Sequence, residues 1–457
     1  MLSLLLALLP GVAALSPLDP TDVRGIEWET EVESALNRAS EEQRIVFVAA
    51  WIDDEGRSAR FAKDVYPNRE IAKLAEETVN LIASPGRHKK SGECRHFSDI
   101  TCLEHQRVHA ELVERDVLRA NSEGAVCAPQ HLWLSPAGEV LLCVPFEMTA
   151  DEVAWCFAFA RWKLNEEAPF HANDGARAPR RLVFGRGSMT APGTSGRGLT
   201  ETELAEELKT LKSAFWNDGR IASWLKVVFT DDDQAAGYIR TELGTGALTW
   251  NGVERLNGAL DVMGEWAPAV FAPVLTDFIK HEDPSVRLRV AIGLEQHGLP
   301  ETAKTIRKAL KKEKDPAVRR AWLRALGAAG YDDRAARKAL MDVVSKEESG
   351  SDRRCAILAL GWSAREEAVG AVLVELLQAE SEEDSRVAGC ALALSRDPSW
   401  IGLLEQRAAQ LPDGPGKQGL LRCAEVLRGA SLAQIRGEIE SLCETPENRG
   451  RLYFQSL

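Results

Sequence analysis

A short motif recurs at nearly constant spacing in the second half of the chain. Four segments begin a run of small and apolar residues with an acidic residue followed by an arginine, and these arginines are Arg287, Arg319, Arg353 and Arg386. Their successive spacings are 32, 34 and 33 residues. A period in this range is typical of a solenoid built from helix pairs, because one pair cannot bury its apolar face without a neighbour. The sequence therefore predicts an all-α solenoid.

The motif also indicates how each repeat begins its second helix. Residues 283–287 and 315–319 both read Asp-Pro-x-Val-Arg. An aspartate at a helix start accepts hydrogen bonds from free backbone N–H groups, and a proline in the first turn leaves no N–H unpaired. The pattern resembles the short HEAT-like repeats of bacterial proteins. We expect five helix pairs between about residues 268 and 429, inside a solenoid that spans residues 200–445, and the resemblance implies a concave face that binds a protein or peptide partner.

The first domain, residues 24–165, alternates between strand and helix patterns. Apolar runs at residues 45–50 and 79–83 predict buried strands. Residues 131–135 and 140–144 predict a hairpin, because a Pro-Ala-Gly-Glu turn separates them. Amphipathic segments predict the helices; they cover residues 29–39, 59–65, 69–77, 101–119 and 150–164. This order predicts a mixed α/β domain.

Several residues of this domain resemble the thioredoxin-like fold. An Ala-Trp pair ends the first strand at Trp51, and Pro129 stands just before the hairpin. The resemblance implies a cis peptide bond before Pro129 that faces the redox motif. The motif itself is missing, because Ile-Asp-Asp-Glu at residues 52–55 stands where Cys-x-x-Cys would be. Dithiol exchange needs two thiols there, so we expect a redox-silent module, with Asp53, Asp54 and Glu55 forming either an acidic rim for a cation or a solvated turn.

Cysteines and histidines gather between residues 94 and 109. Cys94 is followed by Cys102, His105 and His109 in the spacing Cys-x7-Cys-x2-His-x3-His. The last three lie at positions i, i+3 and i+7, which share one face of a helix, and Cys94 lies on the preceding loop. Two thiolates and two imidazoles suit tetrahedral zinc or reduced copper. The sequence therefore offers a metal site formed by Cys94, Cys102, His105 and His109.

Other interpretations of this segment stay open. Cys94 and Cys102 could form a disulfide in an exported protein, with the histidines as bystanders. The histidines could also form the polar side of a surface helix. Cys127, two residues before Pro129, is a substitute ligand if the metal site uses that corner of the fold.

The N-terminal residues have the order of an export signal. An apolar stretch runs from residue 2 to residue 15, with a Pro-Gly break at residues 10–11 and small residues after it. It is too short for a membrane-spanning helix, which needs about 20 residues. We expect residues 1–15 to be a signal peptide and the protein to be periplasmic or extracellular, tethered to a membrane only if the segment stays uncleaved. A buried first helix is the alternative.

Residues 166–199 separate the two domains. They are rich in Gly, Pro and Ser and carry several arginines. This composition predicts a linker, which either rests on an acidic face of a domain or forms an unstructured tether.

Charge and motif content limit the function. The chain has 56 Lys and Arg against 69 Asp and Glu, a net charge of −13, which argues against duplex nucleic acid as a partner. No Ser-His-Asp, Walker or dinucleotide-binding signature occurs, so we assign no reaction and favour a protein that is not an enzyme. The first hypothesis is an exported protein-binding scaffold that combines the HEAT-like solenoid with a redox-silent thioredoxin-like module. The second is a metal-binding or thiol-active protein that uses the segment from Cys94 to His109.

Overall fold

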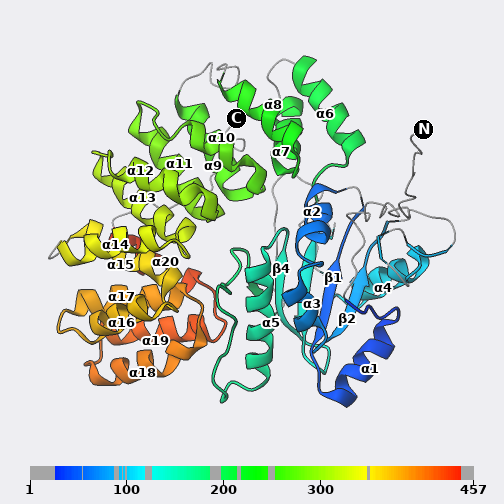
Figure 1. Cartoon of the computed structure of the whole chain (residues 1–457), viewed down its shortest axis with the longest axis horizontal. Coiled ribbons are helices and arrows are strands. Elements are labelled where there is room, and N and C mark those ends of the chain that lie inside the picture. The colour runs from blue at the N-terminus through cyan, green and yellow to red at the C-terminus, as the bar shows by residue number, and fades with distance from the viewer. Residues whose placement is uncertain are drawn as a thin grey trace, which may run out of the picture.

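A computed structural model places an α/β domain beside an all-helical solenoid (Figure 1). It describes residues 26–443, apart from positions 54, 87–91, 95, 98–99, 119–125, 186–196, 214–217, 245–252 and 347–349. The predicted signal peptide and Asp54 lie outside the described residues. Within the described part of the chain, no helix has both the length and the apolar character needed to cross a membrane.

The α/β domain is built on one five-stranded sheet with the order β2-β1-β3-β4-β5. Strand β1 is parallel to β2 and antiparallel to β3, and β3 and β4 form the predicted antiparallel hairpin. The peptide bond between Ala128 and Pro129 is cis. The strands are β1 (Val46–Ala50), β2 (Val79–Ala83), β3 (Gln130–Leu134), β4 (Val140–Pro145) and β5 (Val183–Phe184).

Helices cover both faces of this sheet because successive side chains of a strand point to opposite sides. Phe47 and Ala49 of β1 belong to the apolar cluster that includes residues of α2, α3 and α5. Val46 and Val48 belong to the cluster on the other face, which includes residues of α1 and α4. The helices are α1 (Val32–Glu42), α2 (Gly56–Asp64), α3 (Arg69–Ala75), α4 (Cys102–Glu114) and α5 (Ala150–Leu164).

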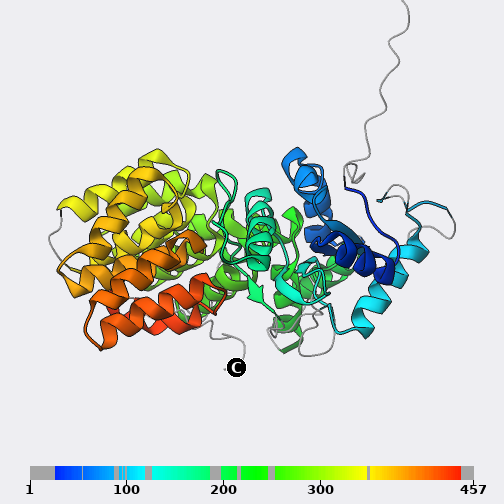
Figure 2. The same ribbon diagram turned by 90° about the horizontal axis from the view of Figure 1, so that it is seen from below.

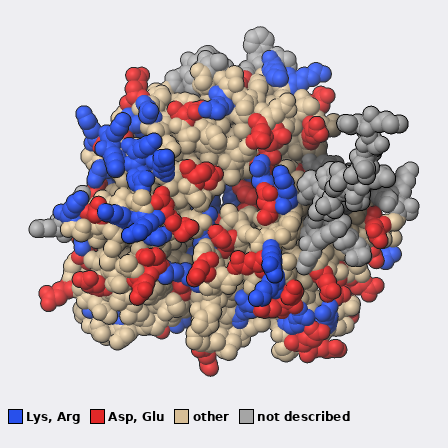
Figure 3. Space-filling model, viewed as in Figure 1, with Lys and Arg blue, Asp and Glu red and all other residues tan. Residues whose placement is uncertain are grey.

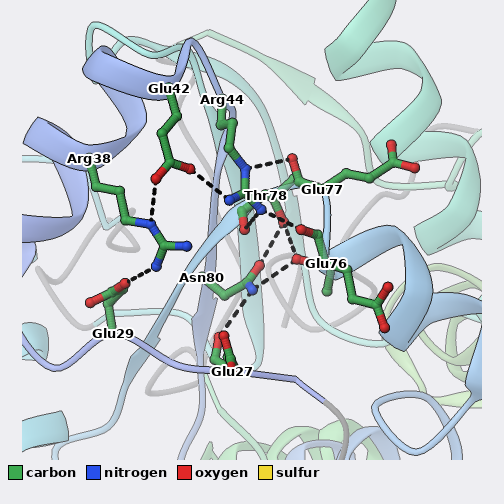
Figure 4. Close-up of polar contacts among 10 residues, drawn as sticks. Glu27, Glu29, Arg38, Glu42, Arg44, Glu76, Glu77, Thr78 and Asn80 are labelled. Atoms are coloured by element: carbon green, nitrogen blue, oxygen red, sulfur yellow. Dashed lines mark hydrogen bonds and ion pairs between the residues drawn. The ribbon is translucent and has the colours of Figure 1, made fainter.

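Polar contacts join the start of the described chain to strand β2 (Figure 4). Arg44 donates to the backbone oxygens of Glu77 and Thr78 at 3.2 and 2.8 Å, which lie between the end of α3 and β2. Asn80 donates to the backbone oxygen of Glu27 at 3.1 Å and accepts from the Thr78 hydroxyl at 2.6 Å. These bonds satisfy backbone groups at the sheet edge, so this polar cluster has a structural role.

The solenoid contains the five helix pairs that the sequence predicts. Four helices precede them: α6 (Glu201–Ser213), α7 (Asp218–Phe229), α8 (Asp233–Gly244) and α9 (Val253–Trp266). The pairs are α10 (Ala272–Asp277) with α11 (Pro284–His297), α12 (Ala303–Leu310) with α13 (Pro316–Ala329), α14 (Arg334–Lys346) with α15 (Ser351–Leu360), α16 (Glu367–Gln378) with α17 (Glu382–Leu394), and α18 (Ile401–Gln410) with α19 (Pro415–Leu427). A last helix, α20 (Ala433–Cys443), contacts α15, α17 and α19.

The regularly spaced arginines connect each repeat to a later one. Arg287 forms a bidentate ion pair with Glu313 at 2.8 Å, and Arg319 pairs with Asp352 of the next repeat at 2.5 Å. Arg353 pairs with Asp384, one repeat further on. The side chains of the predicted caps Asp283 and Asp315 accept backbone N–H bonds at the starts of α11 and α13. The 33-residue period thus reflects ion pairs that fix the stacking of neighbouring repeats.

Residues 166–185 are more ordered in the structure than a linker would be. The sequence predicts a linker over 166–199, whereas β5 at residues 183–184 adds a strand to the sheet and pairs with β4. The same stretch contacts the solenoid: Arg177 donates to the backbone oxygen of Gly298 at 3.3 Å, and Arg365 donates to that of Ala176 at 2.9 Å. Apolar and cationic contacts with both domains hold this stretch in place, which a composition of Gly, Pro and Arg does not reveal.

The solenoid curves into an arc whose inner side faces α5 and residues 166–185 (Figures 1 and 2). At one end, Arg60 of α2 forms a bidentate ion pair with the buried Asp231 at 2.6 and 3.0 Å. At the other end, Lys163 of α5 donates to the backbone oxygen of Arg428 at 3.0 Å. The α/β domain therefore bridges both ends of the arc.

A fragment of residues 200–445 is expected to fold on its own. Its main apolar cluster consists only of solenoid residues, so cutting away the α/β domain leaves that core complete. Helical circular dichroism with a cooperative thermal transition would support this. A fragment without a transition would show that the solenoid depends on the α/β domain.

Candidate metal centre

Three of the four predicted ligands come together in the structure. The sulfur atoms of Cys94 and Cys102 and a ring nitrogen of His105 lie within 4.8 Å of one another, and all three side chains are buried. His109 lies outside this group, one turn further along α4, and is half-buried. The structure therefore supports a three-residue cluster, which we call the Cys-His cluster (Cys94, Cys102 and His105).

The N-terminal cap of α4 and a backbone hydrogen bond in the preceding loop position the three residues of the Cys-His cluster. Thr101 begins α4 with a capping box: its hydroxyl accepts from the backbone N–H of Glu104, whose carboxylate accepts from the backbone N–H of Thr101. Cys102 and His105 are then one turn apart on the same face of the helix. Cys94 returns to this face because its backbone N–H donates to the backbone oxygen of Ile100 at 2.6 Å.

His105 has the protonation state that a metal ligand needs. Its Nδ1 lies 2.9 Å from the backbone oxygen of Ser84, and a bond to that acceptor places the ring proton on Nδ1 and the lone pair on Nε2. Burial lowers the pKa of His105, so the neutral ring persists at pH values where a solvated histidine is charged. A second nitrogen held by a backbone carbonyl is the usual arrangement around a metal-bound histidine.

No disulfide joins Cys94 and Cys102 in the structure. Burial raises the pKa of Cys94, while hydrogen bonds from the backbone N–H groups of His96 and Phe97 to the sulfur act in the opposite direction. A bound cation would supply the charge that favours the thiolate form in this buried place. With His105, the two thiolates give three protein ligands, and a water or a small movement of a neighbour would complete four-coordinate zinc.

The surroundings of the Cys-His cluster include a pair that the sequence did not predict. His96 Nε2 lies 2.7 Å from Asp53 Oδ1, and the His96 ring packs on Trp51 with ring centroids 4.8 Å apart. Asp53 thus joins the first strand to the loop that carries Cys94. The signal available in the sequence was the Cys-x-His spacing at residues 94–96.

Glu55 does not form the acidic rim or solvated turn that the sequence predicts for residues 53–55. Its side chain is 0% exposed and accepts from the backbone N–H of Ser58 at 2.7 Å, which caps α2. It also accepts from the backbone N–H of Gly198 at 3.2 Å. Burial raises the pKa of Glu55. This carboxyl belongs to the domain interface, where tertiary contacts that the sequence cannot show bury it.

Cys127, the predicted substitute ligand, lies outside the Cys-His cluster. It is buried among apolar residues that include Val108 and Phe146, and burial raises its pKa to about 11. His131 on β3 is also buried, accepts or donates one hydrogen bond with the Tyr66 hydroxyl at 2.8 Å, and has a pKa lowered to about 3 by burial. Both residues fit structural roles in the core.

Comparison with known proteins identifies the repeats. A family model described as HEAT repeats matches residues 272–346 and 305–395. No curated protein matches the sequence. A solved structure titled as the complex of CpcE and CpcF of phycocyanin lyase from Nostoc sp. PCC7120 is similar, with a TM-score of 0.32 and 19% identity over 57% of this chain and 99% of that chain. The residues matched by the family model run from α10 to α17, so this part of the solenoid consists of HEAT repeats.

Proposed function

We propose that this protein is a partner-binding scaffold and that its HEAT solenoid holds an acidic protein surface. HEAT repeats stack into extended surfaces that commonly bind proteins. The proposal includes export, for which the apolar N-terminal stretch is the support. It also includes a redox-silent thioredoxin-like module, supported by the cis bond before Pro129, the β3–β4 hairpin and the absence of cysteine at residues 52–55.

The sequence predicts that a partner binds the concave face of the solenoid, but other parts of the chain cover several helices on the inner side of the arc. Arg354 on α15 and Arg386 on α17 bind α20 through the backbone oxygen of Leu442 and the carboxylate of Glu438. Residues 177–180 line the same side near α11 and α13. Because the chain itself covers these helices, we place the partner on the outer surface.

A cationic surface on α12 and α14 carries the proposal. Figure 3 shows Lys and Arg gathered over α12 and extending toward α14. Its exposed members are Lys304, Lys308, Lys311, Lys312, Lys314, Arg334 and Lys338. Within the described part of the chain, no carboxylate lies within ion-pair distance of any of them. In a protein of net charge −13, this concentration of unpaired positive charge favours an acidic partner surface.

Reversing two of these charges is expected to weaken partner binding by about tenfold or more, because attraction becomes repulsion at the contact. A photoreactive amino acid at position 311 would first capture the partner, which is then purified. Its affinity would be measured for the wild type and for Lys304→Glu with Lys308→Glu, at several salt concentrations. The matched control is Lys63→Glu with Lys73→Glu, two exposed lysines of the α/β domain.

The control pair is expected to change affinity less than about twofold, because exposed charges far from a contact are screened. Equal losses in both pairs would contradict a partner on α12. Capture of nucleic acid instead of protein at position 311 would also overturn the proposal.

We also propose a metal-binding role for the Cys-His cluster. Its support is the approach of Cys94, Cys102 and His105 to within 4.8 Å in a buried place, with the His105 lone pair on Nε2. Zinc and reduced copper are the cations that two thiolates and an imidazole favour.

A further inference from the structure

A cavity of about 240 Å³ lies where the inner helices α11, α13 and α20 face α5 and residues 177–180. In Figure 1 these elements meet near the centre of the molecule. The charged side chains that line it are five arginines and three glutamates: Arg177, Arg180, Arg324, Arg396, Arg436, Glu152, Glu295 and Glu440. The cavity is distinct from the Cys-His cluster and from the cationic surface on α12.

The carboxylates of the cavity do not balance its arginines. Arg324 pairs with Glu295 at 2.7 Å, and Arg177 lies 3.5 Å from Glu152. The remaining cations are Arg180, Arg396 and Arg436, and Glu440 is the remaining carboxylate. Among the residues that the structure describes, no carboxylate oxygen lies within 4.0 Å of any of these three guanidinium groups. The cavity therefore has an excess of positive charge.

Of these three arginines, Arg396 is the least exposed to solvent. It is 8% exposed and has a left-handed backbone conformation with φ of 53°, just after α17. Its guanidinium donates one long bond, 3.3 Å, to the backbone oxygen of Ala430 and lies 5.5 Å from the ring of Phe184. Burial lowers its pKa to about 10. A buried cation without a counter-ion destabilises a fold, which points to an anion that the folded protein binds.

Apart from Gln296 and His297, most of the remaining lining is apolar. It includes Leu288, Ile292, Ala321, Leu394 and Ile439 from four helices. The volume lies just below the range of about 300–1,000 Å³ that is typical for ligand pockets, so the ligand is small. An inorganic anion would leave the apolar wall without a contact.

We propose that the cavity binds a small organic anion, a carboxylate or phosphate group attached to an apolar body, with Arg396 as the principal cation. The oxyanion accepts hydrogen bonds from guanidinium groups, and the apolar body packs on α11 and α13. Charge-assisted hydrogen bonds of this kind are stronger than those between neutral groups.

Benzoate and phenyl phosphate are suitable test ligands for the full-length protein, with benzamide as the neutral match and inorganic phosphate as the anion without an apolar body. Calorimetry and thermal melting are expected to show binding of the two aromatic anions and at least about tenfold weaker binding of the other two, because hydrogen bonds to charged groups are the stronger ones. Arg396→Gln is expected to lose about tenfold or more in affinity for the aromatic anions. Arg69→Gln, at an exposed arginine of α3, is the matched control and is expected to bind them as the wild type does.

A ligand role and a structural role of Arg396 give opposite results. If the role of Arg396 is to bind a ligand, the ligand-free Arg396→Gln variant melts at the wild-type temperature or higher. The reason is that the substitution removes a buried charge that has no counter-ion. If Arg396 serves the fold, the variant melts lower and keeps its response to benzoate. Ile292→Trp fills the cavity without changing its charge and is expected to block both aromatic anions. No binding of any test ligand at millimolar concentration, or equal binding of benzamide and benzoate, would overturn the proposal.

Discussion

Replacing Cys102 by serine is expected to lower the affinity of the reduced protein for zinc by more than about 100-fold, since loss of an outer partner alone costs 10–100-fold. Cys102 is the first residue of α4 and stands between the other two members of the Cys-His cluster in the sequence. A serine hydroxyl keeps the size of the side chain but does not supply a thiolate. The cluster would then keep two ligands, which hold zinc weakly.

The measurement is a competition titration of reduced, full-length protein with a chromogenic chelator, using zinc and reduced copper in separate series. Cys355→Ser is the matched control, because Cys355 is equally buried but lies in α15 of the solenoid. The control is expected to bind one metal ion per chain with the affinity of the wild type. Equal, weak binding by the wild type and both variants would contradict a metal site.

The affinity is expected to rise with pH between about pH 6 and pH 8, because each bound thiolate displaces one proton. Burial raises the pKa of Cys94, so at neutral pH the free thiol holds a proton that the metal must release. Burial lowers the pKa of His105, so this ring is already neutral and adds little to the slope in that range. An affinity that does not change with pH would show that Cys94 is not a ligand.

Peptide mapping of unreduced protein distinguishes the metal-site hypothesis from the disulfide hypothesis. A Cys94–Cys102 disulfide in protein purified without reductant, together with no metal uptake after reduction, would establish the disulfide as the role of these cysteines. Recovery of both residues as free thiols with bound metal would support the metal site.

Replacing Arg57 by methionine is expected to destabilise the joined domains by about 1–3 kcal/mol, because the backbone oxygen that Arg57 binds loses its donor and Glu147 loses its cationic partner. The Arg57 side chain is 0% exposed and lies 3.2 Å from Glu147. It donates to the backbone oxygen of Trp266 at 2.8 Å, and its guanidinium lies 4.0 Å from the ring centroid of Phe229. Methionine can fill part of the space but makes none of the polar contacts between α2 and the solenoid.

Urea unfolding with tryptophan fluorescence and helical circular dichroism would measure this effect. Arg38→Gln is the matched control, because Arg38 also forms ion pairs, with Glu29 and Glu42, but is exposed, and such pairs contribute less than about 1 kcal/mol. The Arg57 variant is expected to show the α/β transition at lower urea than the solenoid transition. If both variants unfold at the same urea concentration, Arg57 does not hold the domains together.

Local sequence pattern was sufficient for most elements of both domains. The apolar run at residues 45–50 became β1 at Val46–Ala50, and the amphipathic segment at 150–164 became α5 at the same bounds. The Asp-Pro starts at residues 283 and 315 became capped helix N-termini. These elements could be predicted because strand burial, helix periodicity and capping depend on residues a few positions apart.

The Cys-His cluster was only partly predictable. Helical spacing placed Cys102 and His105 on one face, but it also favoured His109, which lies one turn beyond the other two. The return of Cys94 to this face depends on a backbone bond to Ile100 across the loop, and the contact between Asp53 and His96 joins segments 43 residues apart. The spacing of residues along a helix does not predict where a preceding loop places its side chains.

The sequence by itself determined the two domain types, the period of the repeats and most helix and strand positions, because these follow from short-range patterns of apolar, capping and charged residues. Only the tertiary structure decided that Glu55 and Arg57 are buried at a domain interface, that β5 continues the sheet within the predicted linker, and that an arginine-lined cavity forms between the domains. Each of these features depends on residues more than 30 positions apart. Their burial and charge balance depend on contacts between the arc of repeats and the α/β domain. Short-range sequence patterns do not predict such contacts.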